Sequence, residues 1–293
     1  MRKQFVKTVS ELMDVDSKLS LILGDIGVFG FKDVFLNHPS RTYNIGILEQ
    51  STVSMAAGFS SSGLIPIIHT IAPFLVERCY EQIKIDFAYQ KLKGNFVSVG
   101  NSYDYAALGC THHCPADVGV LKLIPNLQIV LPGTSDEFDK LFKSGYNNEF
   151  PTYYRLSERE NKTIVDVEFG KASILKKGSK ATVVVVGNVL DMVIEACAEF
   201  DVNLIYYTTI EPFDKEVLRK TFNSNKFFII EPYYSGALLN NIFEALSGES
   251  LCIQSVGVPL SFISNYGKSE EHDQLNGMNT KNVKEKLLKL ISQ

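Results

Sequence analysis

The sequence predicts an α/β fold made of two doubly wound domains. Short apolar runs rich in β-branched residues alternate with longer amphipathic segments, which is typical of parallel sheets covered by helices. This alternation stops in a charged stretch and then restarts, which indicates a second, smaller unit. A chain of 293 residues is long enough to bury two ordinary cores. We therefore expect one domain at residues 1–165 and another at residues 172–293.

The first domain should begin with a helix over residues 1–18, because apolar residues recur there with a 3.6-residue period. Charged residues interrupt this segment throughout, so it is not expected to be a signal peptide. A short strand is expected to end at Gly46, and residues 49–63 and 74–90 carry apolar residues at helical spacing. Five runs predict strands that are buried on both faces. They are residues 19–26, 64–71, 94–101, 127–133 and 151–157.

The second domain follows the charged connector SERENKTIVDVEFGKASILKKGSK. Its strands are predicted from four apolar runs, at residues 181–187, 202–208, 226–232 and 251–258. Strands alternating with helical patterns again favour a mostly parallel sheet. We see neither an internal repeat nor a low-complexity segment.

Charge and composition exclude several classes of protein. The net charge is −4 and the basic residues are scattered, so nucleic acid and anionic membranes are not expected partners. No apolar run reaches the roughly 18 residues of a membrane span. Five cysteines, an odd number, do not form a disulfide framework in a chain of this size. We expect a soluble protein of the reducing cytoplasm.

The stretch CTHHC, residues 110–114, has the composition of half a metal site. A structural zinc site needs four ligands, and no second pair of cysteines or histidines exists elsewhere in the chain. We expect no metal ion here. Two interpretations of this stretch stay open: it contains buried cysteines that pack as small apolar residues, or it forms a loop with a catalytic histidine.

The run YNIGILEQSTVSMAAGFSSSG, residues 43–63, places Glu49 at the start of a helix. Taken alone, this carboxylate could simply complement the helix dipole. The whole run, however, resembles the pyrimidine-binding domain of the thiamine-diphosphate enzymes of the transketolase family. The resemblance implies that Glu49 is catalytic and hydrogen-bonds the aminopyrimidine ring of the cofactor. It also implies that Phe74 stacks on this ring and that Ile47 and Arg78 contribute to the cofactor site.

Further segments extend the resemblance over nearly the whole chain. NSYDYAALGCTHHCPAD is similar to the family's Gly-x-Thr-His loop, supplied here by Gly109, Thr111 and His112. The resemblance implies that His112 binds substrate and moves protons. LIPNLQIVLPG and PTYYRLS are similar to two family strands, the second carrying Arg155. TTIEPFD and IIEPYYSGALLNNIFEAL resemble the family's C-terminal domain.

The substrate-binding residues implied by the resemblance are His112, Arg155, His69, Asn101 and Arg2. His69 could equally be a structural histidine, and Arg2 or Arg155 could instead form a surface ion pair, which is the interpretation that we favour for Arg2. Two departures bear on the substrate. Glu158 stands where the family commonly has a second arginine. Leu108 stands where transketolases often carry an acidic residue that hydrogen-bonds the hydroxyl groups of the substrate. We therefore favour an unusual sugar over an ordinary pentose phosphate.

The family's Gly-Asp-Gly motif with its downstream asparagine, which holds the diphosphate and Mg²⁺, has no counterpart here; LGDIGVFG lacks the partner residue. The resemblance therefore implies the C-terminal half of a split transketolase whose partner subunit holds the magnesium diphosphate, as an α2β2 complex. In isolation the chain should form a homodimer. Three alternatives stay open: a deoxyxylulose-phosphate-synthase-like subunit, a 2-oxoacid dehydrogenase β-type subunit that uses pyruvate or another 2-oxo acid, and a non-catalytic module.

Overall fold

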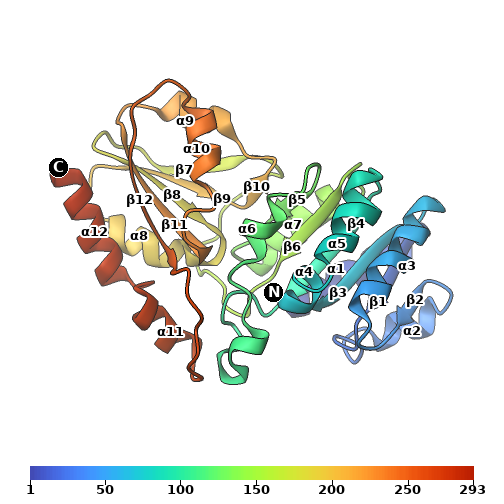
Figure 1. Ribbon diagram of the computed structural model, residues 1–293. Helices are drawn as coiled ribbons and strands as arrows, with labels where there is room; N and C mark the ends of the chain where they lie inside the picture. Colours follow the sequence, from blue (N-terminus) through green and yellow to red (C-terminus); the bar gives the residue numbers. More distant parts are fainter.

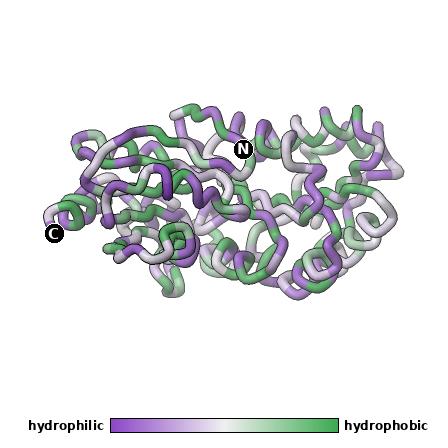
Figure 2. The backbone as a smooth tube through the Cα atoms, turned by 90° about the horizontal axis from the view of Figure 1, so that it is seen from above, coloured by the Kyte–Doolittle hydropathy of each residue, from purple (hydrophilic) through white to green (hydrophobic).

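The computed structural model describes all residues from 1 to 293. Two sheets flanked by helices lie side by side, and the N-terminus lies near the middle of the molecule while the C-terminus lies at one end (Figures 1 and 2). Both sheets are mostly parallel, which confirms the predicted α/β class. No helix is long and apolar enough to cross a membrane.

The first sheet has seven strands in the order β10-β5-β6-β4-β3-β1-β2, all parallel except β10. Every residue of β1, β4 and β6 is buried, which explains why these strands read as continuous runs instead of alternating patterns. The strands are β1 (Leu19–Leu23), β2 (Thr42–Asn44), β3 (Ile65–Ile71), β4 (Gly94–Val99), β5 (Gln128–Val130), β6 (Pro151–Arg155) and β10 (Thr209–Glu211). The helices around it are α1 (Arg2–Val15), α2 (Lys32–Asn37), α3 (Glu49–Ser61), α4 (Ala72–Val76), α5 (Tyr80–Gln82), α6 (Asp117–Leu121) and α7 (Ser135–Gly145).

The second sheet has five strands in the order β12-β11-β8-β9-β7, parallel except for β7 at one edge. Its strands are β7 (Ala172–Lys176), β8 (Thr182–Val186), β9 (Asn203–Tyr207), β11 (Lys226–Tyr234) and β12 (Cys252–Val258). The helices of this unit are α8 (Leu190–Cys197), α9 (Lys215–Thr221), α10 (Leu239–Ala245), α11 (Ser269–Asn276) and α12 (Thr280–Ser292).

Strand β10 connects the two units. Although it follows β9 in the chain, it pairs with β5 of the first sheet, and Leu131 N–H donates to the Thr208 carbonyl at 2.7 Å. Apolar residues of both sheets, such as Val97 and Val185, belong to one buried cluster. The sequence did not predict β7 or β10, because both are short edge strands without a continuous apolar run. The boundary between residues 165 and 172 stays a prediction.

The segment predicted as one helix over 74–90 is divided. Helix α4 ends at Val76, α5 begins at Tyr80, and residues Ile83–Tyr89 continue as a π-helix. Pro73 stands in the first turn of α4, where its missing N–H costs nothing. This early start directly after β3 places Phe74 beside the carboxyl edge of the sheet.

Candidate active site

Four residues singled out in the sequence lie together at one edge of the first sheet. The parallel strands β2, β3 and β4 end there, and the segments that follow them carry Glu49, Phe74 with Arg78, and His112, respectively. Ligands of open α/β sheets bind at this carboxyl edge. Glu49 is the first residue of α3, as predicted, and its side chain is only 4% exposed.

Three further side chains form a chain of contacts with Glu49. The Arg78 guanidinium donates to Glu49 Oε1 at 3.0 Å and lies over the ring of Phe74, with Arg78 Cζ at 3.8 Å from the ring centroid. Phe74 also packs against the His112 imidazole in an edge-to-face arrangement, with the two ring centroids 5.4 Å apart. The structure thus brings four predicted site residues, Glu49, Arg78, Phe74 and His112, into one continuous group. Ile47, two residues before Glu49, is 67% exposed and leaves this edge partly uncovered.

The loop that carries His112 is a compact turn. Two short 3₁₀ segments meet at Gly109, whose φ of 75° favours glycine. His112 N–H donates to the Gly109 carbonyl at 3.0 Å, and the Thr111 hydroxyl lies 3.0 Å from His112 Nδ1. A backbone bridge between Ser102 and Cys114 closes the loop at its base. These bonds hold the imidazole toward Phe74.

Within CTHHC, Cys110 is exposed while Cys114 is buried, so the two sulfurs point to different surroundings. Burial raises the pKa of the Cys114 thiol well above its usual value, which favours an unreactive thiol. Cys114 Sγ donates to Glu77 Oε1 at 3.7 Å, and burial raises the pKa of that carboxyl. No group of three or more histidine, cysteine or acidic side chains is placed to hold a metal ion.

Arg155 lies inside the protein and is held by protein groups. Its Nε donates to Asp117 Oδ2 at 2.6 Å, and its Nη2 donates to Ser102 Oγ at 2.7 Å and to the Pro232 carbonyl at 3.2 Å. Asp117 is completely buried and also accepts a bond from the Tyr153 hydroxyl at 2.9 Å. Two of the three guanidinium nitrogens of Arg155 therefore already bind protein oxygens, and its role toward substrate stays a prediction.

Asn101 and His69 are also buried. Asn101 Oδ1 accepts from the Ser98 hydroxyl at 3.0 Å, and its Nδ2 donates to the Leu156 carbonyl. His69 Nδ1 is 2.8 Å from the Val97 carbonyl, which requires the proton on Nδ1 and leaves Nε2 as an unpaired buried acceptor. Burial lowers the pKa of His69 to about 4, so its ring is neutral. Their expected contact with substrate stays a prediction.

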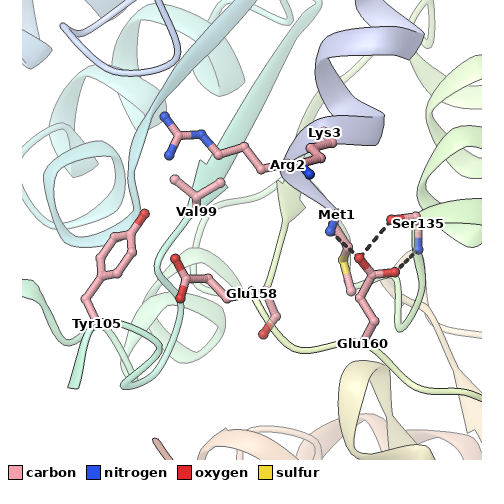
Figure 3. A pocket seen from close by; sticks show the side chains of 9 residues that line it. Met1, Arg2, Lys3, Val99, Tyr105, Ser135, Glu158 and Glu160 are labelled. Atoms are coloured by element: carbon pink, nitrogen blue, oxygen red, sulfur yellow. Dashed lines mark hydrogen bonds and ion pairs between the residues drawn. The ribbon is translucent and has the colours of Figure 1, made fainter. Parts of the chain in front are cut away.

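Arg2 lines a separate cavity of about 390 Å³ near the start of α1 (Figure 3). The Met1 ammonium pairs with Glu160, which also accepts from Ser135. The Arg2 guanidinium and the Glu158 carboxylate make no ion pair within the chain, so the surface ion pair favoured for Arg2 is wrong, and its side chain lines this cavity instead. Figure 3 shows Tyr105 and Glu158 facing the same space as Arg2. The other lining residues are Lys3, Val99 and Ser157.

Sequence reasoning placed Asp117 on the loop of His112 without predicting its partner, and it missed Glu77 and Tyr266, which contact this loop at Cys114 and Gly109. Asp117 lies five residues after His112, but nothing in its local pattern predicts a buried ion pair with Arg155. Tyr266 comes from the second unit and reaches the site only through the tertiary fold. No periodicity or spacing in the sequence carries this information.

Several known proteins are similar to this chain over most of its length. Residues 1–163 match the family model described as transketolase, pyrimidine binding domain. An uncharacterized 33.6 kDa protein in the fasciation locus of Rhodococcoides fascians is 32% identical over 283 residues, which cover 95% of this chain and 91% of that protein. An apulose-4-phosphate transketolase subunit of Phocaeicola vulgatus is 29% identical over 271 residues, which cover 88% of this chain and 87% of that subunit.

Other relatives are longer. The 1-deoxy-D-xylulose-5-phosphate synthase of Pseudoalteromonas translucida is 28% identical over 248 residues, and the match covers 81% of this chain but 40% of the synthase.

Among solved structures, a protein described as a split gene transketolase, inactive beta4 tetramer, superposes with a TM-score of 0.86 at 22% identity over 99% of this chain and 98% of its own. The transketolase from Leishmania mexicana gives a TM-score of 0.81 at 16% identity, over 99% of this chain and 45% of its own.

Proposed function

This chain belongs to the transketolase family, and on that premise we propose that it is the pyrimidine-binding subunit of a split transketolase. The family depends on thiamine diphosphate, and the proposed reaction moves a two-carbon ketol unit from a ketose donor to an aldose acceptor. The observation that carries the proposal is the continuous contact from Glu49 through Arg78 and Phe74 to His112.

The geometry around Phe74 fits the pyrimidine ring of the cofactor. A planar, hydrogen-bonding guanidinium already stacks on the Phe74 ring and donates to the buried Glu49 carboxylate. A ring that stacks on Phe74 and offers a hydrogen bond to Glu49 would make the same two interactions. Because 44% of the Arg78 side chain is exposed, it can leave this place without unpacking a core. Arg78 would thus move away from the face of the Phe74 ring, and the cofactor pyrimidine would take its place.

Three side chains have distinct tasks in this proposal. When bound, thiamine diphosphate supplies a nucleophilic carbon and an electron sink. Glu49 would orient the pyrimidine by a hydrogen bond, and Phe74 would fix its plane. His112 would hold the substrate oxygen and move its proton, which suits a side chain whose unperturbed pKa lies near neutrality.

A partner subunit would complete the site by holding the diphosphate and Mg²⁺, in an α2β2 complex. Relatives described as subunits of apulose-4-phosphate transketolases support such an arrangement. The exposed apolar side chains of Ile47 and Leu48, directly before Glu49, are suited to burial against another chain. In isolation we expect a homodimer of this chain. We also propose a reducing cytoplasm as its compartment, in keeping with its free cysteines.

The cavity beside Arg2 bears on the substrate. Arg2 and Lys3 offer donors to an anionic group, while the Glu158 carboxylate would accept hydrogen bonds from sugar hydroxyls. A sugar phosphate could satisfy both kinds of group at once, although the Glu158 charge would weaken the phosphate contact. Leu108 is 50% exposed and offers no hydrogen bond to a hydroxyl. We infer an acceptor that differs from the ordinary pentose phosphates in the groups near this residue.

Calorimetric titration of thiamine diphosphate with Mg²⁺ tests the proposal. The titrations use this chain alone, and then this chain mixed with a diphosphate-domain subunit encoded by a neighbouring reading frame. We expect tight binding only in the mixture. Glu49→Gln should lose cofactor-dependent ketol transfer, whereas Glu216→Gln, at an exposed glutamate in the first turn of α9, should retain it. Absence of binding in the mixture would favour a non-catalytic module, and tight binding by the chain alone would contradict the split site.

Pyruvate is a second candidate donor, because several relatives are described as 1-deoxy-D-xylulose-5-phosphate synthases. Release of CO₂ from carboxyl-labelled pyruvate by the assembled complex separates the two donors. Labelled CO₂ without ketol transfer from a ketose would favour the synthase-like reaction. Transfer to a lipoyl group would instead indicate the 2-oxoacid dehydrogenase type.

A further inference from the structure

The segment between β12 and the end of α11, residues 259–276, lies along the loop that carries His112; we call this segment the strap. Figure 1 shows it descending from the second unit toward the turn at residues 101–113. The two segments are far apart in the sequence, since the bond between Tyr103 and Asp273 joins residues 170 positions apart. Their contact is therefore a property of the tertiary fold alone.

Polar contacts hold the first half of the loop to the strap. The Ser269 hydroxyl donates to the Tyr103 carbonyl at 3.1 Å, and the Tyr103 hydroxyl donates to Asp273 Oδ1 at 2.6 Å. Asp273 also pairs with Arg159, which follows β6. Tyr103 is buried together with Ile263 of the strap in a small apolar cluster. Two elements of the first unit are thus joined to the strap through one carboxylate.

Two imidazoles hold the second half. The ring of His272, on α11, lies 5.2 Å from the Tyr103 ring and 5.5 Å from that of His113. Both histidines are buried, and their ring nitrogens make no hydrogen bond to another side chain. Burial lowers the pKa of His113, so this ring packs in its neutral form. Because His113 is the residue after His112, this packing fixes the chain directly beside the candidate catalytic imidazole.

Tyr266 makes the most direct contact. Its ring covers Gly109 so closely that a Cβ added to that glycine would lie 2.7 Å from Tyr266 Cε1. The Gly109 carbonyl in turn accepts the His112 N–H at 3.0 Å. Tyr266 therefore contacts the residue that anchors the backbone of His112, and Phe74 contacts the imidazole itself. The Tyr266 side chain is itself 69% exposed, so its ring adds little to the buried core.

We propose that the strap is the positioning element of His112 and that Tyr266 is the positioning residue through which it acts. The proposal rests on the proposed function for the role of His112, but the contact itself does not depend on activity. A smaller side chain at position 266 frees the Gly109 turn and lets the imidazole move relative to Phe74. Displacements of about 1 Å near reacting groups cost up to about a hundredfold in rate.

The test compares Tyr266→Ala, Tyr266→Phe and Leu275→Ala in the full chain. Leu275 is a matched control, because it lies on the same strap and is 71% exposed. The chain has five histidines, so their ring resonances can be assigned by NMR. We expect Tyr266→Ala to shift the resonances of His112 and His113 and leave that of His38 in place. Tyr266→Phe, which keeps the ring, and Leu275→Ala should leave all five unchanged.

In the assembled complex, Tyr266→Ala should lower kcat for ketol transfer about tenfold with little change in the KM of the donor, and Tyr266→Phe should restore it. Unchanged histidine resonances together with an unchanged kcat would overturn the proposal. Loss of partner binding with a normal kcat at saturating partner would also overturn it, in favour of an interface role. If the wild-type complex transfers no ketol unit, the proposed function fails, while the resonances still decide whether the strap positions His112.

Discussion

Arg155→Met should strongly destabilise the protein, because the substitution leaves the Asp117 charge buried without its partner. Arg155 Nε lies 2.6 Å from Asp117 Oδ2, both side chains are buried, and Asp117 Oδ1 has no partner at all. Removing one member of a buried ion pair costs about 3–5 kcal/mol. The surrounding donors do not replace the guanidinium, since only the Tyr153 hydroxyl still reaches Asp117.

Urea unfolding followed by far-ultraviolet circular dichroism measures this loss as a lower midpoint at unchanged slope. Arg219→Met is the matched control, since Arg219 pairs with Glu216 at 2.6 Å on an exposed helix surface and such pairs contribute about 0–1 kcal/mol. Adding Asp117→Asn to Arg155→Met should recover about 2 kcal/mol, because the uncompensated charge is then gone. A loss below about 1 kcal/mol for Arg155→Met would refute the reasoning and would leave Arg155 free to bind substrate.

Three further predictions concern stability and specificity. The folded-state pKa of His69 is lowered to about 4, below its unfolded value, so its contribution to stability is present above about pH 6.5 and is lost as the pH falls toward 4. The wild-type protein should therefore be less stable at pH 4.5 than at pH 7 by on the order of 2–3 kcal/mol, and His69→Asn should remove this difference. An unchanged pH profile in thermal unfolding of the variant would contradict this. Thr134→Ala removes the N-cap acceptor of Glu137 N–H and should cost about 1 kcal/mol in urea unfolding, and an equal midpoint would argue against the cap. Leu108→Asp should raise kcat/KM about tenfold for an acceptor with a free hydroxyl near this residue, relative to the deoxy analogue of that acceptor. An equal change in kcat/KM for both acceptors would place Leu108 outside the substrate site.

Most of the fold could be predicted because its signals are local. Strands such as β1, β4 and β8 are buried on both faces, so their apolar runs are readable without knowledge of their neighbours. The start of α3 at Glu49 was also visible, since a glycine-containing turn precedes a helical period there. Edge strands such as β10 escaped prediction because their pairing depends on a distant partner.

The candidate site was only partly predictable. Family resemblance pointed to Glu49, Phe74, Arg78 and His112, and the structure places these four in contact. It gave no sign that Arg155 would be enclosed by protein groups, because burial depends on what packs around a strand end. Nor could it show whether Arg2 would be paired or would face a cavity.

The sequence by itself determined the α/β class, the strands of both sheets that are buried on both faces, and the residue types available for the chemistry. These follow from periodicity, charge and turn residues, which act over a few positions in the chain. Only the tertiary structure decided that Arg78 covers Phe74, that Asp117 neutralises Arg155, and that Tyr266 rests on Gly109. Such contacts join residues brought together by packing, and local sequence patterns carry no record of those partners.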